Sequence, residues 1–520
     1  MIHPDALKEF VARKRDSHDW VKNVPAADLD AELKALRVQI VHPTPLMIHQ
    51  KACFLLGVAY PAFAFWLDLG TGKTRLALEL LRYHKQQSEL TGALILVRSQ
   101  SALISWENQI REWKIDLPYV SLPKSMPSEE KWSKLEDFEG GLIITTFGGL
   151  TRMLSILKAV KGKRKQKMTP SPKAIKKLAA LIQAIVPDEA STLSNKASVI
   201  SRLVHQLRKY VRFYYELDGM PMGRDPTALW NQLFLVDRGE TLGETLGLFR
   251  AAFFDEKDNY WGGKDYKFRK AMEPELYRIL KHRSITYAEE ECADLPKVIL
   301  KMEEVDLPQE ASTYYETFVK QIRARYAGYQ ERKNAFIRMR QVSSGFVGFT
   351  DDETGERAEI AFAENPKLER LLELVDQVPK GRKFVIFHYF TYSGAIISKA
   401  LKEAGIKHDR LWGGTKDERA VQDRFDYDDS YQGLVASTNV AAYSLNLQRG
   451  NYYFVYEAPV SPKDARQMRK RLPRQGQTRT VFGFDLCVRG TVDRRILQFH
   501  REGQSLFDAI IRNPEKALAD

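Results

Sequence analysis

The residues with the clearest chemical potential form a glycine-containing loop at positions 67–74, Leu-Asp-Leu-Gly-Thr-Gly-Lys-Thr. An apolar run at 62–66 precedes the loop and an apolar-periodic segment at 76–81 follows it, which predicts strand, loop and helix. Glycines let backbone N–H groups curl around a phosphate chain, Lys73 supplies a charge for the β- and γ-phosphates, and the Thr74 hydroxyl can ligate Mg²⁺. The predicted nucleotide-binding residues are Gly70, Thr71, Gly72, Lys73 and Thr74.

Two features qualify this interpretation. Leu67 stands where the full phosphate-loop motif opens with a glycine, so a glycine turn with a chance lysine is the alternative. Upstream of the loop, Gln50 follows an apolar stretch, and its amide can both donate and accept hydrogen bonds. Gln50 is therefore either a reader of an adenine edge or an ordinary polar residue.

A pair of adjacent carboxylates, Asp188 and Glu189, follows the apolar residues 185–187. Successive side chains of a strand point to opposite faces, so the two carboxylates can take different roles. We expect Asp188 to hold Mg²⁺ and Glu189 to orient or deprotonate an attacking water. Without the phosphate loop earlier in the chain, the pair would be interpreted as a turn.

Hydroxyl side chains and a basic run mark a candidate surface for nucleic acid. The apolar strand predicted at 141–146 ends in Thr145 and Thr146, where ligands meet open α/β sheets. Their hydroxyls either touch phosphates or serve strand-end turn chemistry. Residues 161–167 are basic, and such a run is either a solvated, mobile loop or a phosphate-neutralising segment. The candidate contacts within the basic run are Lys163, Arg164 and Lys165.

The second half of the chain repeats the α/β pattern. Apolar runs predict strands at 384–387, 433–438, 452–456 and 481–486, and a final helix at 492–511. The second of these strands ends in Ser437 and Thr438, further candidates for contact with nucleic acid.

A basic segment before the last predicted strand contains Arg471 and Arg474. Residues three apart share one face of a helix. Two guanidinium groups on one face can stabilise the charge on a transferring γ-phosphate. The alternative is a solvated or nucleic-acid-binding basic helix.

Composition bounds the class of protein. With 80 Lys+Arg against 67 Asp+Glu, the 520 residues carry a net charge of +13, which fits a polyanionic partner. The three cysteines are isolated, which argues against a zinc site or a disulfide framework and favours a reducing compartment. The longest apolar run is shorter than the about 20 residues that span a bilayer, and the N-terminus does not read as a signal peptide. We therefore expect neither a transmembrane segment nor a membrane partner.

Taken in order, these segments resemble superfamily-two helicases, and more closely the SWI/SNF-type branch of ATP-driven DNA translocases. The resemblance covers about residues 45–500. It is carried by the matches at 49–50, 68–74, Trp106, 188–191 with Asn195, 217–221, 412–414, 437–438, 445–447 and 467–477. The chain departs from the family pattern at Ser191, where many relatives have His, and at Asp218, where a small hydroxyl residue is usual. Further departures are Ala441, Ala442 and Ser444, where the family has glycines, and Lys470, where it has a glycine.

The resemblance implies an α/β fold of two RecA-like parallel-sheet lobes in tandem with a mainly helical insertion. The expected regions are a helical extension at 1–40, a first lobe at 41–240 with a basic insert at about 158–180, a helical insertion at 241–350, a linker at 351–365, a second lobe at 366–490 and a C-terminal helix at 491–520. The compact form implies a bacterial or phage-infected cell and hence a cytoplasmic location.

The function implied is an ATP-dependent translocase on double-stranded DNA, acting in repair, recombination, replication or protein displacement. ATP and Mg²⁺ are the implied cofactors. Lys73, Asp188 and Glu189 would act with Arg471 and Arg474 from the second lobe. The alternatives are a strand-separating helicase on DNA or RNA, and a nucleic-acid-binding protein with an inactive ATPase.

Overall fold

The computed structural model describes most of the chain. The described residues are 18–40, 42–68, 70–159, 166–219, 221, 226–258, 263–288, 291–292, 296–324, 327–350, 357–438, 440, 447–473, 477–502, 505–512 and 514–518. The chain divides into two compact units, Met1–Ala293 and Asp294–Asp520, called here lobe 1 and lobe 2.

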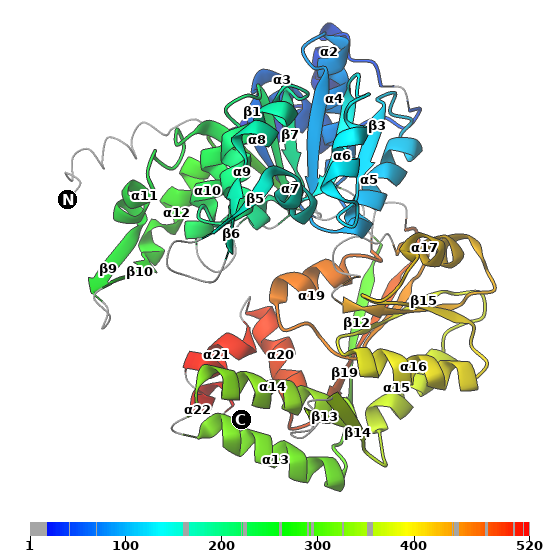
Figure 1. Cartoon of the computed structure of the whole chain (residues 1–520). Coiled ribbons are helices and arrows are strands. Elements are labelled where there is room, and N and C mark those ends of the chain that lie inside the picture. Colours follow the sequence, from blue (N-terminus) through cyan, green and yellow to red (C-terminus); the bar gives the residue numbers. More distant parts are fainter. Residues whose placement is uncertain are drawn as a thin grey trace. The chain divides into compact units, whose positions relative to one another are not determined.

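Lobe 1 is built on a parallel sheet with the strand order β11-β1-β8-β7-β2-β4-β3 (Figure 1). Its strands are β1 (Ala62–Leu67), β2 (Gly92–Val97), β3 (Tyr119–Leu122), β4 (Gly141–Thr146), β7 (Ala184–Pro187), β8 (Phe213–Asp218) and β11 (Ser284–Tyr287). All six residues of β2 and of β4 are buried, because helices cover both faces of the sheet. Strands buried on both faces have unbroken apolar sequences, and these strands were predicted from such runs.

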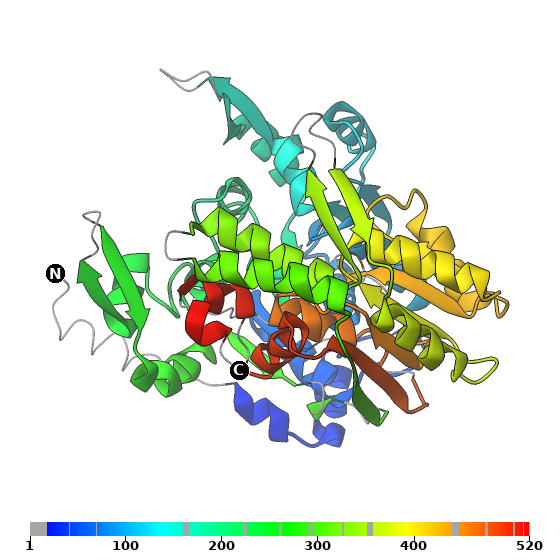
Figure 2. The same ribbon diagram turned by 90° about the horizontal axis from the view of Figure 1, so that it is seen from below.

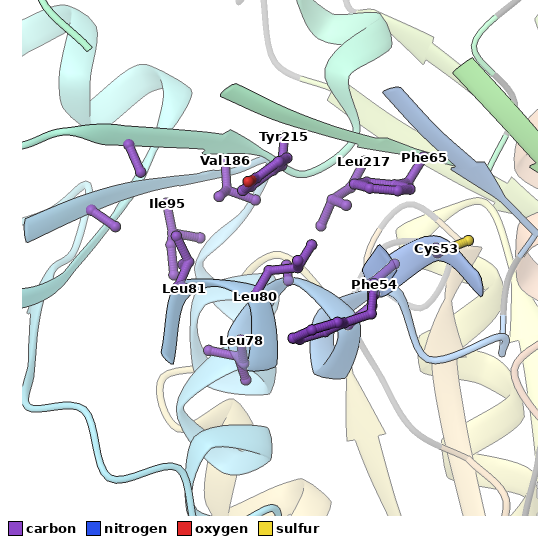
Figure 3. Close-up of a cluster of buried hydrophobic side chains, with 14 of the residues drawn as sticks. Cys53, Phe54, Phe65, Leu78, Leu80, Leu81, Ile95, Val186, Tyr215 and Leu217 are labelled. Atoms are coloured by element: carbon purple, nitrogen blue, oxygen red, sulfur yellow. The ribbon is translucent and has the colours of Figure 1, made fainter. Parts of the chain in front are cut away.

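The helices of lobe 1 fall into two groups around the sheet. One face is covered by α3 (Ile48–Ala59), α4 (Lys73–Gln86) and α5 (Gln100–Glu112). In Figure 3, Leu80 and Leu81 of α4 lie on the side of the helix that faces Ile95 and Leu217 of the strands. The opposite face is covered by α7 (Phe147–Leu154), α8 (Pro172–Ala179), α9 (Val199–Leu207), α10 (Thr227–Asp237), α11 (Leu246–Phe253) and α12 (Glu273–Leu280). The remaining helical segments are η1 (Asp19–Asn23), α2 (Ala26–Ala35), α6 (Ser128–Lys134), η2 (Ala190–Leu193) and η3 (Lys270–Met272).

Lobe 2 is built on a second parallel sheet with the order β12-β19-β18-β15-β17-β16. Its strands are β12 (Val298–Val305), β15 (Phe384–His388), β16 (His408–Leu411), β17 (Gly433–Ser437), β18 (Tyr452–Val455) and β19 (Val481–Val488). The helices α15 (Pro366–Asp376) and α16 (Thr391–Glu403) pack on one face, and α17 (Glu418–Tyr427) and α19 (Pro462–Arg469) on the other. The two parallel sheets confirm the predicted fold class.

A separate helical cluster belongs to lobe 2. It consists of α13 (Gln309–Arg323), α14 (Tyr329–Val342), α20 (Val492–Arg501), α21 (Leu506–Arg512) and α22 (Pro514–Ala517). The green helices α13 and α14 lie side by side in both views (Figures 1 and 2). Three hairpins complete the fold: β5 (Ser155–Ala159) with β6 (Gln166–Pro170), β9 (Phe254–Asp258) with β10 (Lys264–Phe268), and β13 (Phe346–Thr350) with β14 (Arg357–Ala361).

Residues 241–350 differ in detail from the expected helical insertion. Helices dominate this range, but β11 joins the sheet of lobe 1 beside β1, and β12 joins the sheet of lobe 2 beside β19. Neither strand was predicted from the sequence, and each for a physical reason. β11 has only four residues, and β12 is an edge strand whose mixed apolar and charged residues do not form a buried run.

Three smaller expectations also change. The region expected as a basic insert at about 158–180 contains β6, which forms a hairpin with β5, and the helix α8. The basic helix expected to carry Arg471 ends at Arg469, and Pro473 disfavours helix for the residue before it. The final helix expected at 492–511 is divided into α20 and α21.

Candidate functional site

The phosphate loop connects β1 to α4 and has the backbone that its glycines permit. Gly70 and Gly72 have φ angles of 85° and 77°, which side chains other than glycine rarely adopt. A Cβ atom on Gly72 would lie 2.2 Å from Gln50 Nε2, so this position has no room for a side chain. Helix α4 begins at Lys73, directly after Gly72, and points its N-terminus at the loop. The arrangement offers backbone N–H groups and a partial positive charge to an anion.

Two side chains of α3 hold this loop from behind. Gln50 Nε2 donates to the carbonyl oxygens of Thr71 (3.4 Å) and Gly72 (3.2 Å), and Gln50 Oε1 accepts from Met47 N–H at 3.0 Å. His49 Nε2 lies 2.8 Å from the Thr71 carbonyl oxygen. Both side chains are almost fully buried. The expected adenine reader thus has its amide directed at the phosphate loop.

Lys73 rests against the loop itself. Its ammonium donates to the carbonyl oxygens of Leu67 at 2.7 Å and Asp68 at 3.0 Å. Burial lowers the pKa of Lys73, and the nearby carboxylates of Asp188 and Glu189, with others, oppose that shift. Thr74 is the second residue of α4 and is half-buried. Positive φ angles, a helix N-terminus and a desolvated ammonium together fit a chain of phosphates.

The two predicted acidic residues follow β7 at the same edge of the sheet. Burial raises the pKa of Asp188 to about 6, although the Trp106 indole N–H donates to Asp188 Oδ2 at 2.9 Å and so favours the ionised form. Glu189 has φ 61° and ψ 52°, a left-handed conformation that is uncommon outside glycine. Such a backbone holds the two carboxylates in fixed, different directions. Arg98 approaches Glu189 Oε2 at 3.8 Å.

Sequence reasoning did not count Trp106 or Asp218 among the site residues. Asp218 ends β8 and is 1% exposed, and its Oδ2 accepts from the Ser191 backbone N–H at 2.7 Å. This hydrogen bond ties the strand β8 to the turn that carries Glu189. The signals available in the sequence were the match at Trp106 and the departure of Asp218 from the family pattern.

A magnesium ion bound with a nucleotide needs only one or two protein ligands, since phosphates and waters supply the rest. Among the described residues, no cluster of three or more His, Cys, Asp or Glu side chains could hold a metal ion by itself. The half-buried Asp188 and the hydroxyl of Thr74 are of the oxygen-ligand type that Mg²⁺ prefers. The donor set therefore fits an ion that arrives with ATP.

The hydroxyls of Thr145 and Thr146 serve the fold. Both residues are buried; Thr145 Oγ1 donates to the Leu122 carbonyl at 2.8 Å, and Thr146 Oγ1 accepts from Gly149 N–H at 2.9 Å. These contacts match the turn-chemistry alternative. In lobe 2, Ser437 and Thr438 end β17 and are also buried.

The remaining predicted residues are placed as follows. Arg471 is 5% exposed and lies in the turn after α19, where its carbonyl oxygen accepts from Leu447 N–H at 3.2 Å. Arg474 lies outside the described residues, as do Lys163, Arg164 and Lys165.

Comparison with known families decides the identity of the chain. The SNF2-related domain matches residues 66–347, more than half of the chain, and the helicase conserved C-terminal domain matches residues 366–476. The chain belongs to the SNF2-related family. This family consists of helicase-like, SWI/SNF-type ATPases, so the resemblance seen in the sequence is confirmed.

Among curated relatives, this SNF2-related chain is 24% identical over 466 residues to the transcription regulatory protein SNF2 of Saccharomyces cerevisiae, covering 83% of the chain and 25% of the relative. It is also 24% identical over 454 residues to the ISWI chromatin-remodeling complex ATPase CHR11 of Arabidopsis thaliana, covering 83% and 39%. The chain therefore spans less than half the length of these relatives.

A solved structure, the Sulfolobus solfataricus SWI2/SNF2 ATPase core in complex with dsDNA, matches with 21% identity and a TM-score of 0.40, covering 91% of this chain and 95% of that one.

Among the described helices, none combines the length and the apolar character that crossing a bilayer requires.

Proposed function

We propose that this chain hydrolyses ATP in lobe 1 and uses the cycle to move along double-stranded DNA. The observation that carries the proposal is the position of Lys73. Its desolvated ammonium lies at the N-terminus of α4 and interacts electrostatically with Asp188 and Glu189, which follow a neighbouring strand. An ATP–Mg²⁺ complex carries both signs of charge. Its phosphates suit the Lys73 ammonium and the helix N–H groups, and its Mg²⁺ suits the carboxylates.

Each residue then has a role. Lys73 leaves the Leu67 and Asp68 carbonyls and donates to the phosphates, while the glycine loop supplies backbone N–H groups. Thr74 and Asp188 would hold Mg²⁺, which neutralises charge on the phosphates when bound. Glu189 accepts a proton from the attacking water at its carboxylate.

We extend the proposal to Arg471 and Arg474 of lobe 2. A guanidinium that meets the γ-phosphate during hydrolysis stabilises the developing negative charge. If closure of the lobes supplies these groups, hydrolysis becomes dependent on lobe motion, and nucleic acid held by both lobes can be stepped along. The basic run that contains Lys163, Arg164 and Lys165 is proposed to neutralise DNA phosphates.

The deciding experiment is a steady-state ATPase assay of the purified chain with duplex DNA, single-stranded DNA or RNA. We expect duplex DNA to stimulate turnover most. Stimulation by single strands alone would favour a strand-separating helicase, and no turnover under any condition would favour a binding protein with an inactive ATPase. An Arg471→Ala variant should lose turnover while keeping ATP affinity; equal loss of both would contradict the proposed role of this arginine.

A further inference from the structure

The hairpin of β5 and β6 is a two-stranded ribbon on lobe 1. Its strands pair with each other in antiparallel register and form a small sheet separate from the central one. In Figure 2 the teal hairpin extends outward from lobe 1. A two-stranded hairpin is marginally stable in water by itself, so the residues on its two faces indicate which surroundings it suits.

One face of this ribbon carries an exposed apolar pair. Leu157 lies opposite Met168 in the register, and the two therefore share a face. Leu157 is 63% exposed and Met168 is partly exposed. On the other face Ile156, which is 44% exposed, lies opposite the polar Thr169. Single exposed apolar side chains are ordinary, but a cross-strand pair of them offers a partner a continuous apolar contact.

The same ribbon carries positive charge that its own segment does not balance. The register places Lys158 opposite Lys167, and like charges directly opposite each other destabilise a pair of strands. Between positions 152 and 187 the sequence contains no aspartate or glutamate. An anion from outside this segment would relieve the repulsion.

The second hairpin of lobe 1, β9–β10, is built in the opposite way. Lys264 lies opposite Asp258 and pairs with its carboxylate at 2.7 Å, and Lys257 lies opposite Asp265. This ribbon thus balances its charges across its own strands. The unbalanced lysines are therefore specific to β5–β6 and not common to the hairpins of this lobe.

We propose that the β5–β6 ribbon enters the major groove of duplex DNA, with Leu157 and Met168 toward the base edges and Lys158 and Lys167 near the flanking phosphates. The major groove admits a two-stranded β-ribbon, and apolar side chains there can contact the methyl group of thymine. Lysines supply the charge that neutralises the phosphates. The inference rests on the proposed function for its DNA partner, and it adds a groove contact to the phosphate contacts proposed above.

The first test measures the affinity of the full chain for duplex DNA, without ATP, over a range of salt concentrations. Leu157→Asn should weaken binding about 3- to 10-fold, because an apolar contact is lost. The slope of log K against log salt should stay the same, since no charge is removed. The matched control is Ile156→Asn on the other face, which must lose less affinity. Equal losses in the two variants, or no loss in Leu157→Asn, would overturn the proposal.

The second test removes charge instead of apolar surface. Lys158→Met should reduce the salt slope by about 0.9, the effect of one lost phosphate contact. Lys257→Met in β9 removes the same charge from the balanced hairpin and should leave the slope unchanged. If Lys158→Met also left the slope unchanged, the lysines would serve another polyanion, such as an acidic protein, and the groove proposal would be overturned.

Duplex RNA distinguishes insertion into the groove from contact with the outer surface. The major groove of A-form RNA is too deep and narrow for side chains to read. At low salt, where backbone contacts suffice for binding, Leu157→Asn should therefore bind duplex RNA as tightly as the unmodified chain does. An equal loss of affinity for duplex RNA and duplex DNA would overturn the groove contact.

Stability and turnover are measured on the same variants. Leu157→Asn should leave the melting temperature unchanged, because the side chain is exposed. Should it fall, Leu157→Thr, which keeps a strong strand former, must show the same loss of DNA affinity. If duplex DNA fails to stimulate ATPase activity while Leu157→Asn weakens DNA binding, the motor function fails and the groove contact stands. If stimulation occurs and Leu157→Asn binds DNA normally, the groove contact fails and the motor function stands.

Discussion

Charge is handled differently at the phosphate-loop site of lobe 1 and in two ion pairs of lobe 2. In lobe 2, Lys367 pairs with Asp493 at 2.6 Å, and Arg469 donates to Asp485 at 2.9 Å. In lobe 1, Lys73 donates to carbonyl oxygens while several carboxylates surround it, and the Asp188 carboxylate accepts from a neutral indole. These two pairs of lobe 2 are matched within the fold, whereas the phosphate-loop site of lobe 1 leaves charge that a ligand can complete. Lobe 1 also contains a matched buried pair away from this site, Arg82 with Glu79 at 2.8 Å.

The difference has an energetic meaning. A paired buried charge is costly to break but contributes no binding capacity, because its partner is already present. A charge without a full partner shifts the pKa values of the groups around it and can bind an ion of opposite sign. Substitutions in the Lys367–Asp493 pair should therefore affect stability, and substitutions at the phosphate-loop site should affect turnover.

The largest expected effect is on catalysis in lobe 1. Glu189→Gln keeps the shape of the side chain but cannot accept a proton from water, so ATP turnover should fall about 100-fold or more. Lys73→Ala should abolish turnover as well. DNA binding should persist in both variants and ATP binding in Glu189→Gln, and the exposed Glu129→Gln is the control. Normal turnover in either site variant would mean that the catalytic residues are elsewhere.

The next largest effect is on the stability of lobe 2. Lys367→Met leaves the Asp493 carboxylate buried without its cation, which should cost about 3–5 kcal/mol of unfolding free energy in a denaturant titration. The double variant Lys367→Met/Asp493→Leu should recover much of that loss. If the single variant were as stable as the unmodified chain, the Lys367–Asp493 pair would not stabilise lobe 2.

A smaller effect concerns the pH dependence of stability in lobe 1. Burial raises the pKa of Glu216 from 4.5 to about 8, although Trp66 Nε1–H donates to its Oε1 at 3.1 Å. A carboxyl whose folded pKa is raised favours the folded state while protonated, so this contribution is lost as pH rises from about 4.5 through about 8. Glu216→Gln should flatten the dependence of unfolding free energy on pH in that window. If the pH dependence of the unfolding free energy were unchanged, groups other than Glu216 would be responsible for it.

The smallest effect is expected from the indole beside Asp188. The ATPase rate should rise with pH through about 6, because Asp188 must be ionised to hold Mg²⁺ and its pKa is raised to about 6. Trp106→Phe removes the hydrogen bond that opposes this shift, so the rising limb should move to higher pH. A limb that stays in place would show that another group limits the rate at low pH.

The sequence by itself determined the residues of the phosphate loop, the Asp188–Glu189 pair and most central strands. Buried parallel strands are recognisable because both faces are apolar, and a phosphate loop because its glycines and lysine are consecutive. These signals are local. β4 and β2 were visible for this reason, while the short β11 and the edge strand β12 were not.

The tertiary structure decided which side chains meet. The Trp106 indole donates to Asp188 and Asp218 accepts from Ser191, although 82 and 27 residues separate the partners along the chain. Thr146 turned out to cap the start of α7, Thr145 bonds the Leu122 carbonyl at the end of β3, and Lys131, a plain lysine in the sequence, is fully buried. Burial and charge pairing arise only when distant segments pack, because desolvation depends on every neighbour and not on the residue type.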